Sequence, residues 1–91
     1  MNFPSVTKTS SAAISAVPGA VLSVCLTSVG NAASVVLYDN TSGAGTVLCA
    51  LAVPAAATSV TYSPPGGIPA YTAIYATITG TAPYVTVQYK P

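Results

Sequence analysis

The only acidic residue of the chain, Asp39, stands at the start of a glycine-rich segment whose residue types could bind a ligand. The sequence of Val35–Leu48 reads VVLYDNTSGAGTVL, so a carboxylate, an amide and two hydroxyls lie beside Gly43 and Gly45. Oxygens of this kind can coordinate a cation, and a glycine-rich loop can cradle a phosphate. Each of these sites needs further residues, which the rest of the sequence must supply.

Neither kind of site finds the residues that it needs. A Walker-type phosphate loop has a lysine after its second glycine and a helix behind it, whereas Gly45 is followed by TVLCALAV, which is typical of a strand. A calcium site needs more carboxylates than Asp39 alone can supply. We therefore expect a turn. Asp39 and Asn40 would accept hydrogen bonds from backbone N–H groups of the loop, and the two glycines of the loop would adopt backbone angles that other residues resist.

The remaining polar side chains argue against catalysis. The chain has no histidine, arginine or tryptophan, and it has one carboxylate side chain. An acid–base pair, a Ser-His-Asp arrangement and an imidazole or multi-carboxylate metal site therefore cannot be assembled. A nucleophilic cysteine would have no histidine to activate it. We expect a protein that is not an enzyme and that binds no metal or cofactor.

The two cysteines are expected to remain free, structural thiols. Strand parity places Cys49 on the apolar face of its strand, together with Val47, Leu51 and Val53. It places Cys25 on the less apolar face of its strand, together with Val21, Ser23 and Thr27. On these faces the two thiols need not meet, and a disulfide requires Cα atoms within about 7 Å.

Charged side chains are almost absent, which bears on the choice of partner. Lys8, Asp39 and Lys90 are the charged residues among 91, whereas about 25% of an ordinary soluble domain is charged. A net charge of +1 with lysines at opposite ends cannot provide the cluster of phosphate contacts that nucleic-acid binding requires. So uncharged a surface favours contact between protein molecules, and we expect a homo-oligomer, with a trimer as its expected state.

No membrane-spanning segment or secretory signal is expected either. The longest apolar candidate, Ser11–Gly30, contains serines throughout and is interrupted by Pro18-Gly19, so it falls short of the roughly 18 apolar residues that a spanning helix needs. The N-terminal sequence MNFPSVTKTS lacks the basic start and apolar core of a signal peptide. We expect a mature chain that does not enter a membrane.

Strand signals recur along the chain, and helical signals are nearly absent. Thr and Val are abundant, and breaks rich in Pro, Gly and Asn separate the runs of β-favouring residues. About seven strands are predicted, over Ala12–Val17, Ala20–Ser28, Ser34–Asp39, Thr46–Val53, Thr58–Ser63, Tyr71–Gly80 and Tyr84–Tyr89. The sequence thus predicts an all-β fold, an antiparallel β-sandwich of Ig-like or jelly-roll connectivity over residues 12–91, after an N-terminal arm of residues 1–11.

Alternation within the strands predicts which side chains form the core. In Ala20–Ser28 the even positions Leu22, Val24 and Leu26 are apolar, and the same pattern recurs in the two C-terminal strands. The opposite faces consist of Thr, Ser, Ala and Tyr, and almost no Lys or Glu guards the strand edges against further pairing. We expect these faces and edges to contact other proteins.

The hairpin around Asp39 also carries a family resemblance. The strand GAVLSVCL, the hairpin VVLYDNTSGAGTVL and the terminal YVTVQY resemble small structural proteins of tailed bacteriophages, in which a V-x-x-YDNTS-x-G-T-V hairpin recurs. The resemblance spans the chain roughly from Ile14 onward, and its motif marks a hairpin rather than chemistry. It implies a β-sandwich subunit that is repeated many times on a virion, and it transfers no catalytic residue.

We therefore expect a virion protein that is assembled in the host cytoplasm, a capsid decoration (cement) protein that self-associates and bridges capsid subunits. Its partners would be further copies of itself and the major capsid protein or another virion protein. The alternatives are a tail or fibre component and a carbohydrate- or surface-binding module that uses its tyrosines, Tyr62 among them. The candidate contact residues are Phe3 and Pro4 in the arm and Tyr71, Tyr75 and Tyr84 in the sandwich.

Overall fold

Runs of Val, Thr and Tyr between Pro- and Gly-rich breaks form strands, as their β-branched and aromatic side chains favour. The computed structural model describes residues 4–55, 57–81 and 83–90. The strands are β1 (Ser5–Lys8), β2 (Ala12–Ser15), β3 (Gly19–Val29), β4 (Ala33–Asp39), β5 (Thr46–Val53), β6 (Ala57–Tyr62), β7 (Ile68–Ala70), β8 (Ile74–Gly80) and β9 (Tyr84–Lys90). Within these described residues, no helix has the length and apolar character to cross a membrane.

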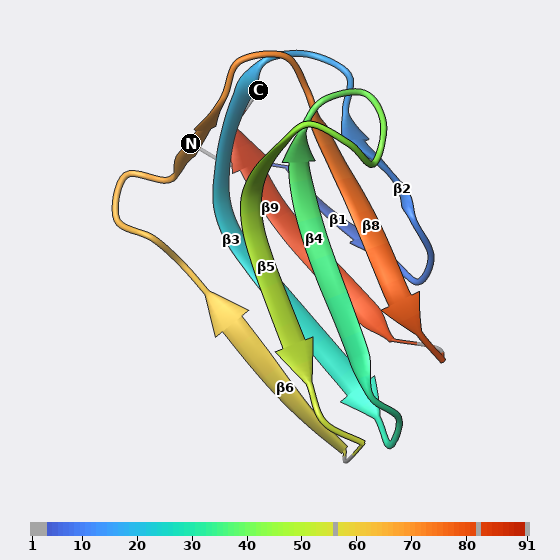
Figure 1. The fold of residues 1–91 in the computed structure, drawn as a ribbon. Helices are drawn as coiled ribbons and strands as arrows, with labels where there is room; N and C mark the ends of the chain where they lie inside the picture. The colour runs from blue at the N-terminus through green and yellow to red at the C-terminus, as the bar shows by residue number, and fades with distance from the viewer. Residues whose placement is uncertain (1–3, 56, 82, 91) are drawn as a thin grey trace.

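Two antiparallel sheets pack face to face, which confirms the predicted β-sandwich (Figure 1). One sheet has five strands, in the order β1-β9-β3-β6, with β7 paired to β3. The other has four strands, in the order β2-β8-β4-β5. β6 pairs with the second half of β3 and β7 with its beginning, so these two strands are successive pieces of one sheet edge.

The pairings are those of one long hairpin that has rolled up. β4 pairs with β5, β3 with β6 and β7, β2 with β8, and β1 with β9, in nested order around the loop of residues 40–45. Two further pairings, of β3 with β9 and of β4 with β8, hold the rolled layers together. The loop that follows Asp39 is therefore the tip of the whole hairpin, and nearly every other pairing joins segments far apart in the sequence.

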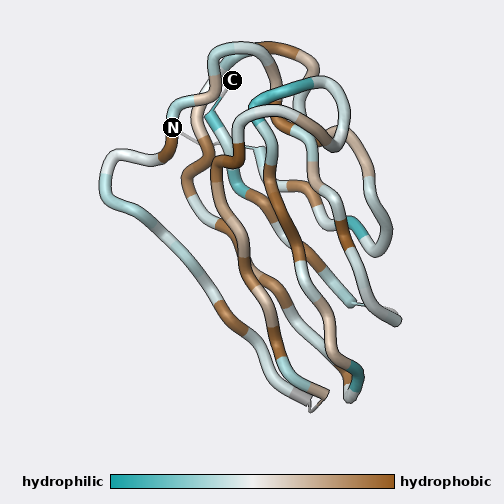
Figure 2. Tube along the Cα trace, viewed as in Figure 1, coloured by the Kyte–Doolittle hydropathy of each residue, from teal (hydrophilic) through white to brown (hydrophobic). Residues whose placement is uncertain are grey.

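The inner faces of both sheets supply the core. Figure 2 shows apolar residues recurring along the strands, while strongly hydrophilic residues are few. The fully enclosed side chains include Val21, Val24, Leu26, Val35, Leu37, Ile74, Val85 and Val87. Alternation correctly predicted Val24 and Leu26 in β3, Ile74 and Ala76 in β8, and Val85 and Val87 in β9.

Two β-bulges correct the predicted alternation. The register of β3 against β9 shifts between Val21 and Ser23, so Val21 is buried and Leu22, predicted in the core, lies half-buried outside it. The register of β4 against β5 shifts between Leu37 and Tyr38, which leaves Val47 53% exposed although it was predicted beside Cys49. One extra residue in a strand moves every side chain beyond it to the other face.

The chain also has two strands that the sequence did not predict. Ser5–Lys8, expected in an N-terminal arm, forms β1 and pairs with β9 of the same chain. The short β7 extends the edge that β6 begins. In addition, the predicted strand Tyr71–Gly80 begins only at Ile74. The segment Tyr71–Ala73 has a different role, because its backbone amides point to Asp39.

Candidate interaction surfaces

Asp39 ties the tip of the hairpin to a segment that lies 32 to 34 residues away. Its Oδ2 accepts the backbone N–H of Tyr71 at 3.0 Å, and its Oδ1 accepts those of Thr72 at 2.8 Å and Ala73 at 3.4 Å. The hydrogen bonds from Tyr71 and then Thr72 lower the pKa of Asp39, against a smaller opposing effect of desolvation. The expectation that Asp39 binds amides of its own loop is therefore wrong.

The loop itself is closed by Asn40 and by glycine, as a turn requires. The Asn40 Oδ1 accepts the N–H of Thr41 at 2.7 Å, and its Nδ2 donates to the carbonyl of Ala44 at 2.8 Å. Gly45 has a φ of +104°, which confirms its predicted role, since side chains rarely adopt this region. The same prediction is wrong for Gly43, whose φ does not lie in this region; a Cβ there would lie 2.6 Å from the Thr77 Oγ1, so the Thr77 side chain would have to move.

This geometry favours a structural turn over a ligand site. Three amide hydrogens already face the Asp39 carboxylate, and they would face a bound cation as well. Within residues 4–55, 57–81 and 83–90, no three His, Cys, Asp or Glu side chains come together in a group that could hold a metal ion. The Gly45 that would have to wrap a phosphate is followed by β5 rather than by a helix N-terminus.

The candidate contact residues lie on separate parts of the surface. Tyr71 is 78% exposed at the hairpin tip, whereas Tyr84 begins β9 at the opposite end of the sandwich. Tyr75 is half-buried on the outer face of the four-stranded sheet, next to Gly43 of the folded-over loop. Pro4 is exposed, and its carbonyl accepts the N–H of Tyr89, while Phe3 lies outside the described residues. Tyr71 and Tyr75 both lie near the hairpin tip and Tyr84 lies at the other end of the sandwich, so the described candidates do not form one patch.

The outer face of the five-stranded sheet is covered with hydroxyl groups. Cross-strand rows on this face join Ser5, Gln88 and Ser23, then Thr7, Thr86, Cys25 and Thr61, then Tyr84, Thr27 and Ser59. The Oγ1 atoms of Thr7 and Thr86 share a hydrogen bond of 3.0 Å. None of these side chains is charged, so this face has the Thr- and Ser-rich character expected from the sequence.

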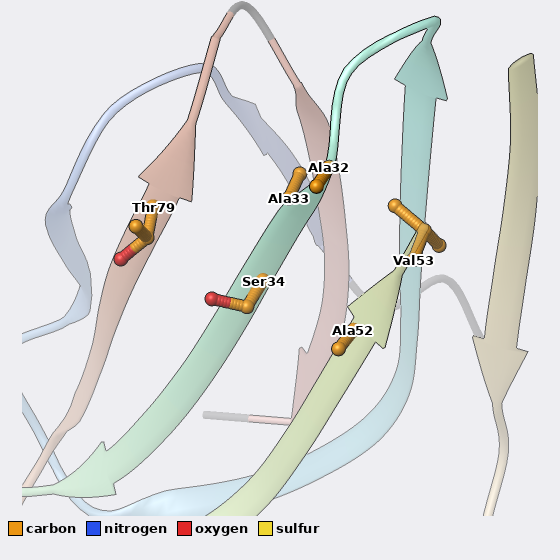
Figure 3. A pocket seen from close by; sticks show the side chains of 6 residues that line it. All are labelled: Ala32, Ala33, Ser34, Ala52, Val53 and Thr79. Carbon is orange, nitrogen blue, oxygen red and sulfur yellow. The ribbon is translucent and has the colours of Figure 1, made fainter. Parts of the chain in front are cut away.

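The outer face of the four-stranded sheet has smaller and more apolar side chains along the rows that include Ser34 and Val36. Its cross-strand rows join Ala52, Ser34 and Thr79, then Ala50, Val36 and Thr77. A shallow hollow of about 280 Å³ lies at one end of this face, lined by Ala32, Ala33, Ser34, Ala52, Val53 and Thr79 (Figure 3). Two hydroxyls are its only polar side-chain groups, so it lacks the converging polar groups of a small-molecule site.

The edge strands of the two sheets differ in how readily a further strand could pair with them. β1 and β2 have four residues each, and β2 has an irregular register against β8. β6 has six residues and is rich in hydroxyls, and β7 contains Pro69. β5 has eight residues without charge or proline. Short, bulged or proline-containing edges resist pairing. β5 also has a bulge, at Leu48, but its segment Cys49–Val53 pairs regularly with β4 and contains neither proline nor charge.

The cysteines lie as their strand parity predicted. Cys49 is buried in the core, and desolvation raises the pKa of its thiol. Cys25 is half-buried on the outer face of the other sheet, where its Sγ lies 3.8 Å from the Thr27 Oγ1. Both thiols are free. The two therefore act as packing residues on different layers of the sandwich.

Comparison with protein-family models, with curated protein sequences and with solved structures finds no match to this chain.

Proposed function

We propose that this protein is a structural subunit of a virion, a capsid decoration protein that associates with further copies of itself and bridges neighbouring capsid subunits. The proposal extends to location, on the virion, and to the absence of catalysis. The partners would be the major capsid protein or another virion protein, reached without nucleic acid, membrane or cofactor.

The strand order is the observation that carries this proposal. Sheets ordered β1-β9-β3-β6 and β2-β8-β4-β5, with β7 as a second piece of the β6 edge, support a jelly roll of eight strands as the topology of this sandwich. The jelly roll recurs in viral capsid and lectin domains. The hairpin of Val35–Leu48 adds its resemblance to small virion proteins of tailed bacteriophages. Fold alone never fixes function, so the surface must agree with it.

The surface supports contact with protein rather than chemistry on a small molecule. The outer faces carry little charge, with Lys90 at the end of β9 as the charged residue on the outer face of the five-stranded sheet, and the tip carboxylate is engaged by backbone amides. A carbohydrate module would need aromatic platforms beside several polar side chains. Tyr71 and Tyr75 both lie near the hairpin tip, Tyr84 lies at the opposite end of the sandwich, and Tyr62 lies on the β6 edge, so the four tyrosines do not form one platform and this alternative receives less support. A tail or fibre role needs the same surface chemistry as a capsid role.

The test is to find the protein on particles and to locate it there. Mass spectrometry of purified virions should detect the chain at many copies per particle, and immunogold electron microscopy should label the head. Label on the tail or fibres would favour the alternative location. Absence of the chain from purified particles, with the major capsid protein detected in the same sample, would contradict a virion role.

A further inference from the structure

The outer edge of β5 is apolar on both faces of its sheet. In Cys49–Val53, which reads CALAV, Ala50 and Ala52 are exposed on the outer face. Cys49 and Val53 are buried in the core, and Leu51 is half-buried against it. The other long edge, β6, carries Thr58, Ser59, Thr61 and Tyr62 on its exposed positions instead. An apolar edge gains more than a hydroxylated one when a second strand removes it from water.

The backbone of β5 leaves hydrogen-bonding groups for a further strand. Across residues 4–55, 57–81 and 83–90, β5 pairs with β4 alone, and no loop or side chain bonds to its backbone. Every second N–H and C=O of an edge strand points away from its one neighbour. An added antiparallel strand would satisfy these groups with main-chain hydrogen bonds.

Self-pairing satisfies the geometry of this edge. Directly opposed residues of an antiparallel pair lie on the same face of the sheet. When Cys49–Val53 pairs with a second copy of itself, the two-fold axis must therefore pass at a residue and not midway between two residues. Centred on Leu51, the pairing uses the whole segment between the bulge at Leu48 and Pro54. It sets Ala50 of each copy opposite Ala52 of the other on the outer face, and Cys49 opposite Val53 on the core face.

Charge does not oppose this arrangement. The chain's charged residues are Lys8 in β1, Asp39 at the end of β4 and Lys90 at the end of β9, and β5 has none. Two copies joined at β5 therefore bring no like charges together along the paired strands. An isologous contact of this kind is the commonest way in which identical chains associate.

We propose that Cys49–Val53 pairs antiparallel with the same segment of a second copy, about a two-fold axis at Leu51, so that the two four-stranded sheets become one continuous sheet. The proposal rests on the self-association proposed above and identifies the free edge of β5 as the surface through which two copies associate. It replaces the trimer expected from the sequence with a dimer as the basic unit, because a two-fold contact joins chains in pairs.

Paired substitutions test the register as well as the edge. Ala50→Lys with Ala52→Lys sets two like-charge pairs across the contact, whereas Ala50→Lys with Ala52→Glu sets two opposite-charge pairs there. The first variant should weaken the dimer about tenfold or more in dissociation constant, and the second should restore it. Ser59→Lys with Thr61→Lys places the same charges on exposed positions of β6 and should leave the dimer intact. Sedimentation velocity over a dilution series measures all of these states.

Circular dichroism of each variant establishes that it has folded before its association is compared. A monomeric or trimeric wild type, or a dimer that survives Ala50→Lys with Ala52→Lys, would overturn the proposal. Loss of the dimer in the β6 variant would do the same, because the effect would not be specific to β5. The virion role fails separately: a β5 dimer that is absent from particles refutes that role, and a particle protein that is monomeric in solution refutes only the β5 contact.

Discussion

Val21 and Leu22 provide a direct test of the bulge in β3, because alternation and structure rank them in opposite orders. The structure encloses Val21 completely in the core. Leu22 is half-buried outside the core, and its Cδ2 would lie 3.2 Å from a Cβ placed at Gly67, so it packs beside the loop after β6. Substituting each by Ala measures which of the two belongs to the core.

The expected magnitudes follow from the carbon atoms that each change removes. Val21→Ala removes two buried carbons at about 0.8 kcal/mol each and leaves a cavity, so it should lower the free energy of unfolding by about 2–3 kcal/mol. Leu22→Ala removes three carbons from a partly solvated site and should cost less than about 1 kcal/mol. An unbulged β3 would reverse this order, with about 2–5 kcal/mol for Leu22→Ala.

Thermal unfolding followed by circular dichroism separates these outcomes. An unfolding entropy of about 2.1 cal/mol/K per residue gives roughly 0.19 kcal/mol/K for 91 residues. Val21→Ala should then lower Tm by about 10–16 °C, and Leu22→Ala by less than about 5 °C. Both variants and the wild type must be compared at one protein concentration, because association raises Tm. A larger loss for Leu22→Ala than for Val21→Ala would refute the bulge.

Four further measurements follow from the same structure. Hydrogen bonds, that from Tyr71 foremost, lower the pKa of Asp39, so the stability that the Asp39 carboxylate contributes is present above its usual pKa of 3.8 and is lost as pH falls through the folded value. Asp39→Asn should therefore be less stable than wild type at neutral pH and should lose less stability on acidification. Urea titrations at several pH values would measure both differences. Iodoacetamide should modify Cys25 faster than the buried Cys49, whose thiol has a raised pKa, and equal rates in mass spectrometry would contradict this. Gly45→Ala should destabilise the fold by about 1–3 kcal/mol, because its φ of +104° disfavours a side chain; no change in denaturant midpoint would argue against that conformation. The dissociation constant of self-association should change less than about threefold between low and high salt, since no charged side chain lies on β5, and dissociation at moderate salt would refute apolar docking.

The sequence predicted the fold class because alternation is a local property of each strand. In β8 and β9, neither of which carries an extra residue in its pairing with a central strand, Ile74, Ala76, Val85 and Val87 are buried as alternation predicts. In β3 and β5 the same rule failed at Val21, Leu22 and Val47, each beside a bulge. A bulge is fixed by how a strand fits its partner, and neither strand's own sequence specifies that partner.

Strands at the sheet edges were missed for a related reason. Ser5–Lys8 is short and carries a lysine, so its own sequence gives little reason to form a strand. It becomes β1 because β9 offers it an edge with matching alternation, with Val6 opposite Val87. Ile68–Ala70 contains a proline and becomes β7 only beside the beginning of β3.

The sequence predicted that the segment after Asp39 is a turn, but it did not predict which backbone amides bind the Asp39 carboxylate. A segment with Asn and two glycines predicts a turn, and Asn40 and Gly45 form one. That Asp39 would bind amides beginning at Tyr71 depends on β8 lying next to β4, which no local pattern specifies. The tyrosines were likewise identified as surface residues, whereas only the fold could place Tyr84 at the opposite end of the sandwich from Tyr71 and Tyr75.

The position of Asp39 explains how one carboxylate can matter to so uncharged a protein. The residue ends β4 at the tip of the rolled hairpin, and the amides that it accepts belong to the segment leading directly into β8. Because β8 pairs with β4, these hydrogen bonds fix where the long connection rejoins the sheet and so help to set the register of the two strands. The negative charge is thereby directed at backbone amides, and the outer faces consist mainly of uncharged side chains, with hydroxyls on one sheet and alanine, valine and tyrosine beside hydroxyls on the other. A protein with such faces has main-chain hydrogen bonds and apolar area as its means of binding a partner, and both are available together at the free edge of β5.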